Sequence, residues 1–336
     1  MARRRAVTIY DVAKRSGVST ATVSRALRGR GAPETSARVL AIAEELQFRP
    51  SHLARSLAER QHAANGIVFP DLAGPYYADV VLGYEEVAAE LGRSVLILTT
   101  KGRESAEQMV LDLAGRVDGM VIMGRTVDED VVRRIAGTGL PVVLLARTPV
   151  DDVDAITAES RRSARKLIEH LLSHGHRDLV FLGDPTESFD VASRYAGFVE
   201  AVTAAGLPAP PAVPCAFDLD AGYAGGSRLL RSRSRPGAIV CANDEVALGV
   251  LTAARERALD VPGDLAVTGW DDLLAARFAG LTTVRQPMRE LGATAAQRLH
   301  ERIVESEQSG PSVARQEVLA TQLIVRDSCG SHGLGT

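Results

Sequence analysis

Two short helices separated by one glycine are the feature that most constrains this chain of 336 residues. Thr8 can cap a first helix whose inward face carries Val12 and its apolar neighbours. Gly17 predicts a short turn, and Ser19 can cap a second helix that faces inward through Val23 and Leu27. Two short helices joined by a glycine-containing turn predict a helix-turn-helix.

A third helix is predicted to begin at Pro33 and Glu34, since proline is favoured in the first helical turn. Its predicted inward positions are Val39, Ile42, Ala43 and Leu46. The second helix would then present Thr20, Ala21 and Arg25 outward, together with Ser24. These residue types suit a DNA major groove, because arginine can donate two hydrogen bonds to guanine and methyl groups pack on thymine. The competing interpretation is an ordinary three-helix bundle with a solvated polar face.

The charge distribution favours DNA binding over that alternative. Residues 1–62 contain 12 Lys and Arg against 5 Asp and Glu, whereas the remainder contains 27 basic and 37 acidic residues. The formal net charge of −3 therefore conceals a basic head on an acidic body. Such an asymmetry is typical of a domain that binds a polyanion.

The motifs of residues 8–13, 17–25, 48–50 and 53–57 closely resemble the head of the lactose/galactose repressor family. In that family the last segment is a hinge helix that folds on the operator and wedges a leucine into the minor groove. The resemblance assigns the wedge to Leu57, with Ala54 beside it, and apolar wedging is a known way to bend DNA. Ser51 departs from the family's usual asparagine, although serine still caps a helix. The predicted DNA-binding residues are Thr8, Tyr10, Ser19, Thr20, Ala21, Thr22, Ser24, Arg25, Arg28, Ser51, His52, Ala54, Arg55 and Leu57.

From Gly66 onward, short β-branched runs alternate with helix-length amphipathic stretches, which predicts parallel βαβ units. Strands are expected at 67–69, 95–98, 120–122, 142–145, 179–182, 239–240, 265–268 and 318–325. Helices are expected at 76–91, 105–113, 130–135, 160–172, 191–205, 223–230, 245–257 and 288–304. Two successive sets of such units predict two similar subdomains with a ligand cleft between them.

The body resembles the periplasmic sugar-binding-protein fold, which implies three crossings between subdomains, near Thr157, Pro287 and Leu319. The predicted fold class is α/β. It has an N-terminal three-helix helix-turn-helix head plus hinge helix, then a periplasmic-binding-protein-like body of two doubly wound parallel-sheet subdomains. The expected domains are 1–50 (DNA binding), 51–62 (hinge helix and linker) and 63–336 (effector binding and dimerisation). Within the last, subdomain 1 covers about 63–157 and 288–319, and subdomain 2 about 158–287 and 320–330.

The sequence offers little support for an enzyme. It lacks a phosphate-binding GxxxxGK[ST] loop, a GxSxG nucleophile elbow and an HExxH zinc motif. His170 and His174 have the spacing of a metal pair, but histidine near a helix C-terminus is the more ordinary explanation. Asp271 and Asp272 could suggest an acid/base pair, yet spacing identifies no companion group. We therefore expect no metal and no cofactor.

Three motifs at the ends of predicted strands favour a ligand site instead. Residues 193–198, 242–244 and 269–272 each match family motifs, as does the signature at 281–287. By that match Arg194, Asn243 and Asp271 would hydrogen-bond the hydroxyl groups of a small ligand. The predicted effector-binding residues are Tyr76, Tyr77, Glu159, Arg194, Phe217, Asn243, Asp271 and Gln286. The alternatives are core packing for the aromatic residues and a structural ion pair between Arg194 and Asp271.

Two departures from the family bear on the ligand. Glu159 and Ser160 stand where the family usually has Asp-Asn, and the loop 184–190 is unusually acidic. The longer carboxylate would change the pocket, and the acidic loop argues against a phosphorylated effector.

These observations predict a cytoplasmic transcriptional repressor of carbohydrate-related genes, without a membrane segment. We expect it to bind a pseudo-palindromic operator as a homodimer, under the control of a small ligand that is expected to be a sugar. Three scattered cysteines fit a reducing compartment, and the absence of a heptad repeat after Val325 favours a dimer over a coiled-coil tetramer. The rival interpretations are an exported solute-binding protein, an enzyme, and a DNA-binding protein controlled by a protein co-regulator. The basic head and the absence of an export signal count against the first of these.

Overall fold

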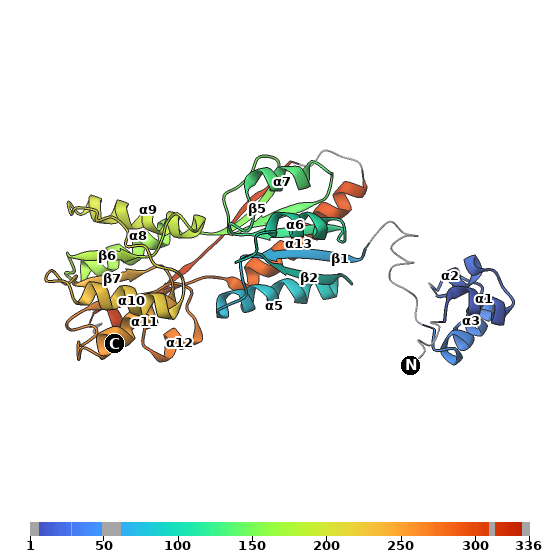
Figure 1. Cartoon of the computed structure of the whole chain (residues 1–336), viewed down its shortest axis with the longest axis horizontal. Helices are drawn as coiled ribbons and strands as arrows, with labels where there is room; N and C mark the ends of the chain where they lie inside the picture. Colours follow the sequence, from blue (N-terminus) through green and yellow to red (C-terminus); the bar gives the residue numbers. More distant parts are fainter. Residues whose placement is uncertain (1–6, 28, 49–61, 309–312, 331–336) are drawn as a thin grey trace, which may run out of the picture. The chain divides into compact units, whose positions relative to one another are not determined.

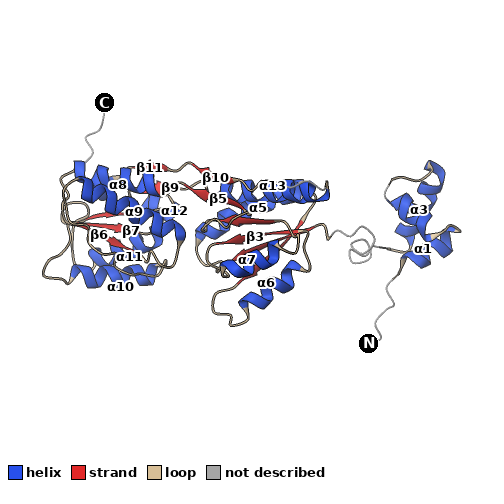
Figure 2. Cartoon of the chain, turned by 90° about the horizontal axis from the view of Figure 1, so that it is seen from above, coloured by secondary structure: helices blue, strands red, loops and turns tan. Residues whose placement is uncertain are grey.

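The computed structural model describes residues 7–27, 29–48, 62–308 and 313–330. The chain divides into two compact units, Met1–Ala63 and Ala64–Thr336 (Figures 1 and 2). The hinge helix predicted within 51–62 lies outside the described residues. His62 is the one residue of that range that the structure describes.

The first unit contains three helices, α1 (Ile9–Ser16), α2 (Thr20–Leu27) and α3 (Pro33–Glu45). The predicted caps are confirmed. The Asp11 carboxylate accepts hydrogen bonds from the backbone N–H (2.8 Å) and the hydroxyl (2.7 Å) of Thr8. Gly17 ends α1 in the left-handed conformation (φ 70°), and Ser19 Oγ accepts from the Thr22 N–H at 3.2 Å.

One fully buried valine from each helix forms the centre of the head: Val12, Val23 and Val39. Ala26, which the sequence pattern did not single out, is also buried. Leu27, predicted to face inward, is only partly buried and packs against the edge of this cluster. A small residue at position 26 lets α2 approach its neighbours closely, which fixes the face that α2 leaves exposed.

The second unit begins with a lobe built on a six-stranded parallel sheet of order β10-β5-β4-β3-β1-β2. Its strands are β1 (Ala64–Phe69), β2 (Ser94–Thr99), β3 (Gly119–Met123), β4 (Val142–Leu145), β5 (Asp154–Ala158) and β10 (Gln316–Leu319). One face is covered by α5 (Pro75–Glu90) and α13 (Met288–Glu307), the other by α6 (Ala106–Ala114) and α7 (Glu129–Ala136). Every residue of β3 and β4 is buried, as expected of strands covered on both faces.

Glycine allows α5 and α13 to pack backbone against backbone. A Cβ added at Gly83 would lie 1.9 Å from the carbonyl oxygen of Arg289. A Cβ added at Gly292 would lie 2.0 Å from the carbonyl oxygen of Val80. Both distances are far inside van der Waals contact, so any larger residue would have to separate the two helices.

The second lobe is built on the parallel strands β6 (Leu179–Leu182), β7 (Ala238–Cys241) and β8 (Ala266–Thr268). Helices α8 (Arg161–Ser173) and α9 (Phe189–Ala204) cover one face. Helices α10 (Leu219–Leu230) and α11 (Asp244–Arg255) cover the other. A short helix α12 (Leu274–Phe278), an antiparallel pair of β9 (Thr283–Arg285) and β11 (Gln322–Ile324), and a 3-10 turn at Asp327–Cys329 complete the lobe.

The chain passes between the lobes three times, between β5 and α8, between β9 and α13, and between β10 and β11 (Figures 1 and 2). The single strand predicted for 318–325 is therefore wrong. Residues 316–319 pair with β5, and residues 322–324 pair with β9. The residue pattern alone did not reveal that the chain changes sheets midway, although the family resemblance implied a crossing near Leu319. The predicted α/β class with a helix-turn-helix head and a two-lobed parallel-sheet body is confirmed.

Strand β5 was not predicted, because it starts on a charged residue. Asp154 is fully buried, and its carboxylate accepts from Arg298 Nε (2.7 Å) and the Arg315 backbone N–H (2.6 Å). These partners lie far away in the sequence and compensate the cost of burying the charge. No helix in the described part of the chain combines the length and apolar character needed to span a membrane.

Candidate functional site

The exposed face of α2 carries the predicted DNA-contact residues. Ala21 and Arg25 are exposed, whereas Thr20, Thr22 and Ser24 are half-buried. Val23 and Ala26 anchor the opposite face of the helix in the head core. A helix fixed in this way presents a small methyl group and a guanidinium on one side, as a major-groove recognition helix requires.

The remaining predicted DNA-contact residues fall into two groups. Tyr10 is 73% exposed at the start of α1, and Thr8 and Ser19 cap α1 and α2. Helix N-termini supply N–H groups that suit phosphate oxygens, so both caps are placed where a DNA backbone could approach. The other group, Arg28, Ser51, His52, Ala54, Arg55 and Leu57, lies outside the described residues.

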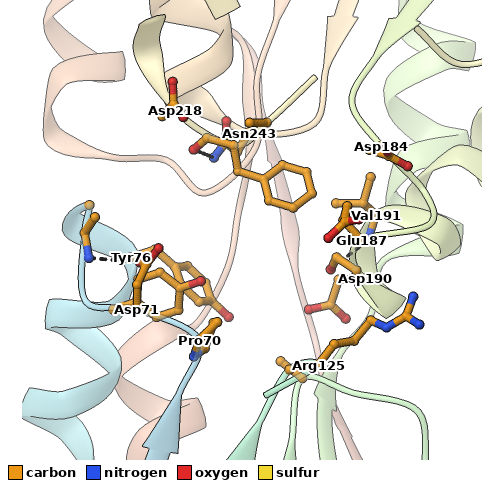
Figure 3. A pocket seen from close by; sticks show the side chains of 18 of the residues that line it. Pro70, Asp71, Tyr76, Arg125, Asp184, Glu187, Asp190, Val191, Asp218 and Asn243 are labelled. Atoms are coloured by element: carbon orange, nitrogen blue, oxygen red, sulfur yellow. Dashed lines mark hydrogen bonds between the residues drawn. The ribbon is translucent and has the colours of Figure 1, made fainter. Parts of the chain in front are cut away.

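A cavity of about 790 Å³ opens in the body between the two lobes. First-lobe residues that line it follow β1, β2, β3 and β4 or begin α5. Second-lobe residues follow β6, β7, β8 and β9, belong to the start of α9, or precede α10. The cavity thus lies at the carboxyl ends of both sets of parallel strands, where ligands of such sheets bind. Figure 3 shows Asp71 and Tyr76 on one side, with Asp190 and Glu187 opposite and Asn243 above.

Arg194 is the central cation of this cavity. It lies on α9, is only 6% exposed, and donates from Nη1 to the Ala242 carbonyl oxygen at 2.7 Å. The guanidinium carbon lies 4.5 Å from the centre of the Trp270 ring, a cation–π arrangement. Arg194 Nε and Trp270 Nε1 are buried and have no hydrogen-bond partner in the described part of the chain. The arginine is thus held in place with donor capacity left over.

Asp271 follows β8 and lines the same cavity. Its backbone has φ 115°, a strained value for a residue other than glycine, and its Oδ1 accepts from Gln286 Nε2 at 2.6 Å. Burial raises the pKa of Asp271 to about 7, against the opposing effects of the Arg194 charge and the Gln286 hydrogen bond. Strain and desolvation together indicate a position kept for binding rather than for stability.

Asp272 has a structural role instead. Its fully buried side chain accepts from Arg285 Nε at 2.7 Å and Arg326 Nη2 at 2.5 Å. Burial by itself would raise the pKa of Asp272, but these two arginines more than offset it and hold the pKa below its usual value. The carboxyl groups of Asp271 and Asp272 therefore do not act as an acid/base pair.

Asn243, Phe217 and the two tyrosines also line the cavity. Asn243 caps α11 by accepting from the Val246 N–H at 2.9 Å, and its Nδ2 donates to the Phe217 carbonyl oxygen at 3.1 Å. Tyr76 and Tyr77 pack edge to face with ring centroids 5.4 Å apart. Gln286 lines the cavity with its Oε1 buried and without a partner among the described residues. The structure thus brings together seven of the eight predicted effector residues.

Glu159 is the exception and does not line the cavity. Its carboxylate accepts from the backbone N–H groups of Arg162 (2.6 Å) and Ser163 (2.9 Å) at the start of α8. Helix N-termini attract carboxylates, so this side chain is occupied as a cap. The structure assigns Glu159 to that helix start, and the expectation that it shapes the pocket is corrected.

Several residues of this site were not among the predicted effector residues. Trp270 supports Arg194, while Asp190, Arg125 and Glu245 line the cavity. Asp190 stands four residues before Arg194, so helical periodicity alone could have placed both on one face. Arg125 and Glu245 show no comparable signal, because each approaches a residue of the opposite lobe, Thr186 and Gly74 respectively.

Two contacts connect the cleft walls. Arg125 of the first lobe donates to the Thr186 carbonyl oxygen of the second. A Cβ added at Gly74 of the first lobe would lie 2.6 Å from Glu245 Oε2 of the second. The lobes are therefore in contact on either side of the cavity.

The cavity shows no activated nucleophile. Burial raises the pKa of the Cys215 thiol in its wall to about 11, which disfavours the reactive thiolate. His170 Nε2 lies 3.3 Å from Cys329 Sγ at the far end of the second lobe. Across the described ranges, no group of three or more His, Cys, Asp or Glu residues is arranged to hold a metal ion.

Comparison with known proteins places these features in a family. A family described as "Bacterial regulatory proteins, lacI family" matches residues 8–51. One described as a periplasmic binding protein-like domain matches residues 168–329. The two matches fall on the helix-turn-helix head and on the second lobe with the C-terminal crossings.

Full-length relatives support the same assignment. Catabolite control protein A of Priestia megaterium is 32% identical over 299 residues, which cover 86% of this chain and 90% of that protein. The HTH-type transcriptional repressor PurR of Pasteurella multocida (strain Pm70) is 31% identical over 335 residues, covering 97% of this chain and 99% of that protein. Among solved structures, the lac repressor dimer bound to operator and the anti-inducer ONPF matches with a TM-score of 0.87 at 28% identity, covering 97% of this chain and 100% of that one.

The head, the two-lobed body and the relatives that share both over nearly their whole length lead to one conclusion. The chain belongs to the LacI family of bacterial regulatory proteins and is a DNA-binding transcriptional repressor with a ligand-binding domain, not an enzyme.

Proposed function

We propose that this repressor binds a pseudo-palindromic operator as a homodimer in the cytoplasm and that a small polyol, a sugar, controls its affinity from the interlobe cavity. The observation that carries the effector proposal is that the cavity is lined by both Arg194 and Asp271, each buried. A guanidinium donates and a carboxylate accepts, so adjacent hydroxyl groups of a polyol can be bound by both.

Unused hydrogen-bonding groups support this proposal. Arg194 Nε and Gln286 Oε1 are buried beside the cavity and lack a partner in the part of the chain that the structure describes. Native structures rarely leave such groups unpaired, because each costs about 1–3 kcal/mol. The aromatic rings of Tyr76 and Phe217 add flat apolar surface on the two sides of the cavity, suited to the face of a sugar ring.

The proposed mechanism connects the cleft to the head through the lobes. A ligand that binds both walls favours one arrangement of the lobes, and in a dimer that arrangement decides whether the hinge helices can form on DNA. The effector acts only through its different affinity for the two states, and a coupling of about 1–3 kcal/mol would be typical. The lac repressor offers a precedent for the assembly, because its solved form is a dimer on its operator with an anti-inducer bound.

Base reading is assigned to Thr20, Ala21 and Arg25 on α2, and minor-groove wedging to Leu57. Leu57→Ala should weaken operator binding and reduce the bend angle of the DNA, because the apolar wedge is lost. Circular permutation of the operator site in a gel-shift assay measures that angle. An unchanged angle would refute the wedge without affecting the roles of the α2 residues.

The central experiment is an operator-binding titration at fixed salt concentration in the presence of single compounds from a panel of sugars and nucleobases. A sugar that changes the operator dissociation constant by about 5- to 150-fold supports the proposal. A change produced by nucleobases and by no sugar would contradict the polyol effector. A preference for the operator that no small molecule alters would favour a protein co-regulator.

A further inference from the structure

The charge of the cavity wall carries information beyond its hydrogen-bonding groups. Seven acidic side chains line the cavity against three basic ones. A wall with such an excess of negative charge in a low-dielectric cleft attracts cations and repels anions.

Each of the three cations already has a partner. Lys101 pairs with Asp71 at 2.7 Å, and Arg125 donates to the Thr186 carbonyl oxygen. Arg194 donates to a backbone carbonyl and stacks on Trp270. The guanidinium of Arg194 is therefore the cation available to both Asp190 and Asp271 at the buried end of the cavity.

Asp190 is a buried acidic residue of the wall whose side chain keeps an unpaired oxygen among the described residues. It is 5% exposed, and its Oδ1 atom has no hydrogen-bond partner anywhere in the described residues. Figure 3 shows Asp190 and Glu187 together at the cavity wall opposite Tyr76. Its place in the first turn of α9 favours a negative charge there, since the helix dipole is positive at that end.

A buried carboxylate without a partner is costly, so a group that completes it must be part of the functional state. Burial raises the pKa of Asp190, and the charge of Arg194 opposes that rise. Two buried carboxyl groups, Asp190 and Asp271, face one guanidinium, so Arg194 can balance the negative charge of only one of them.

We infer that the effector is an amine-bearing polyol of the amino-sugar class, whose ammonium group binds Asp190 while its hydroxyl groups bind Arg194 and Asp271. This inference rests on the proposed effector site and specifies the chemistry of its ligand. An ammonium donates up to three hydrogen bonds and supplies the missing positive charge, whereas a neutral hydroxyl supplies one donor and no charge. A phosphorylated sugar would bring further negative charge against the acidic wall.

The test compares matched ligands on the full-length protein. Trp270, the single tryptophan of the chain, lies against Arg194, so its fluorescence reports binding. Glucosamine, galactosamine and mannosamine are each titrated beside the parent hexose, the N-acetyl derivative and the 6-phosphate. The glucosamine and glucose disaccharides of the same linkage form a further pair, since the cavity volume admits two rings.

At least one amino sugar should bind about tenfold or more tightly than its parent hexose and its N-acetyl derivative, because one charge-assisted hydrogen bond replaces a neutral one. Asp190→Asn should reduce that preference to about twofold or less, because the amide no longer offers a negative charge to the ammonium group. Asp220→Asn removes one negative charge from an exposed position of α10 outside the cavity and should retain the full preference.

Equal or tighter binding of the neutral hexose overturns the inference, as does a preference that survives Asp190→Asn. If the Asp190→Asn variant folds poorly, its Trp270 emission will show this. The comparison of ligands on the unaltered protein then still tests the inference. If neutral hexoses release the operator and amino sugars are no better, the inference fails and the proposed function stands. If no polyol in either series binds or alters operator affinity, both fail.

Discussion

Asp271 and Asp272 are neighbours in sequence, and their replacement by asparagine should change stability in opposite directions. Asp271 lies in the cavity wall with one amide donor, and its pKa is raised to about 7, chiefly by burial. Asp272 accepts hydrogen bonds from Arg285 and Arg326, which hold its pKa below its usual value. Asparagine keeps the shape and an acceptor oxygen in both places, so the two substitutions differ mainly in the charge that they remove.

The magnitudes follow from these environments. A pKa raised from 3.8 to about 7 opposes the ionised form of Asp271 by on the order of 2–4 kcal/mol. Asp271→Asn removes that cost, so the free energy of unfolding at pH 8 should rise by most of this amount. Asp272→Asn should instead cost about 2–3 kcal/mol, because two charge-assisted hydrogen bonds are weakened. The cost stays moderate because the side chain of Arg285 is 46% exposed and remains solvated.

The pH dependence has a definite sign at each position. The protonated form of Asp271 is favoured in the folded state, so its contribution to stability is complete below about pH 4 and is lost as the pH rises through about 7. The ionised form of Asp272 is favoured in the folded state, so its contribution is present above about pH 4 and is lost on acidification below its lowered pKa. The advantage of Asp271→Asn over the unaltered protein should therefore grow between pH 4 and pH 8.

Urea unfolding of the effector-free protein, followed by Trp270 fluorescence, measures both effects. Trp270 is 2% exposed in the second lobe, so its emission reports the unfolding of the lobe that contains both aspartates. Titrations at pH 4.5, 6, 7 and 8 give the free energy of unfolding at each pH from the midpoint and slope. A loss of stability in Asp271→Asn at pH 8, or an advantage that does not increase with pH, would refute the desolvation argument. An Asp272→Asn variant with unchanged free energy of unfolding would refute the structural role of the two arginines.

Three further outcomes are expected. Arg25→Ala should weaken operator binding by about 1–3 kcal/mol and random DNA much less, which competition gel shifts measure; equal losses would exclude base reading. Arg194→Ala should abolish the effector response and leave operator binding intact, and retained induction in a reporter assay would remove Arg194 from the site. Gly83→Ala should cost more than about 3 kcal/mol in denaturant unfolding, since its Cβ would collide with the Arg289 carbonyl at 1.9 Å. Gly115→Ala, whose Cβ would lie 3.7 Å from the Asp112 carbonyl oxygen, should be neutral or slightly stabilising, and equal losses for both glycine variants would contradict the packing argument.

Local signals predicted much of this fold. Caps at Thr8 and Ser19 and the glycine between them placed α1 and α2 correctly, because each depends on residues within three or four positions. Strands buried on both faces, such as β3 and β4, were equally accessible as apolar runs. What the local residue pattern could not show were features that depend on distant partners. Strand β5 begins with a buried aspartate neutralised by Arg298. The division of the C-terminal segment between two sheets was implied by the family resemblance, through the crossing near Leu319, and not by the residue pattern.

The cavity residues also divide into those that a local motif predicts and those that depend on distant contacts. Arg194, Asn243 and Asp271 were predicted because each belongs to a short motif at the end of a strand. Glu159 was misplaced for the converse reason, since a motif position does not reveal that a carboxylate already accepts two hydrogen bonds at a helix start. The role of Trp270 in supporting Arg194 depends on a packing contact between α9 and the segment that follows β8, which no local spacing encodes.

The hydrogen-bond partners of the buried charged residues distinguish those that stabilise the fold from those that we assign to ligand binding. Asp154 and Asp272 serve stability and accept hydrogen bonds from arginines. Asp190, Arg194 and Gln286 each retain an unpaired buried atom among the described residues, as do several residues outside the cavity. That three such residues line one cavity favours the proposal that a ligand supplies contacts there. A stabilising substitution at Asp190 or Asp271 should accordingly reduce ligand affinity, and a variant that gains both stability and affinity would contradict this view.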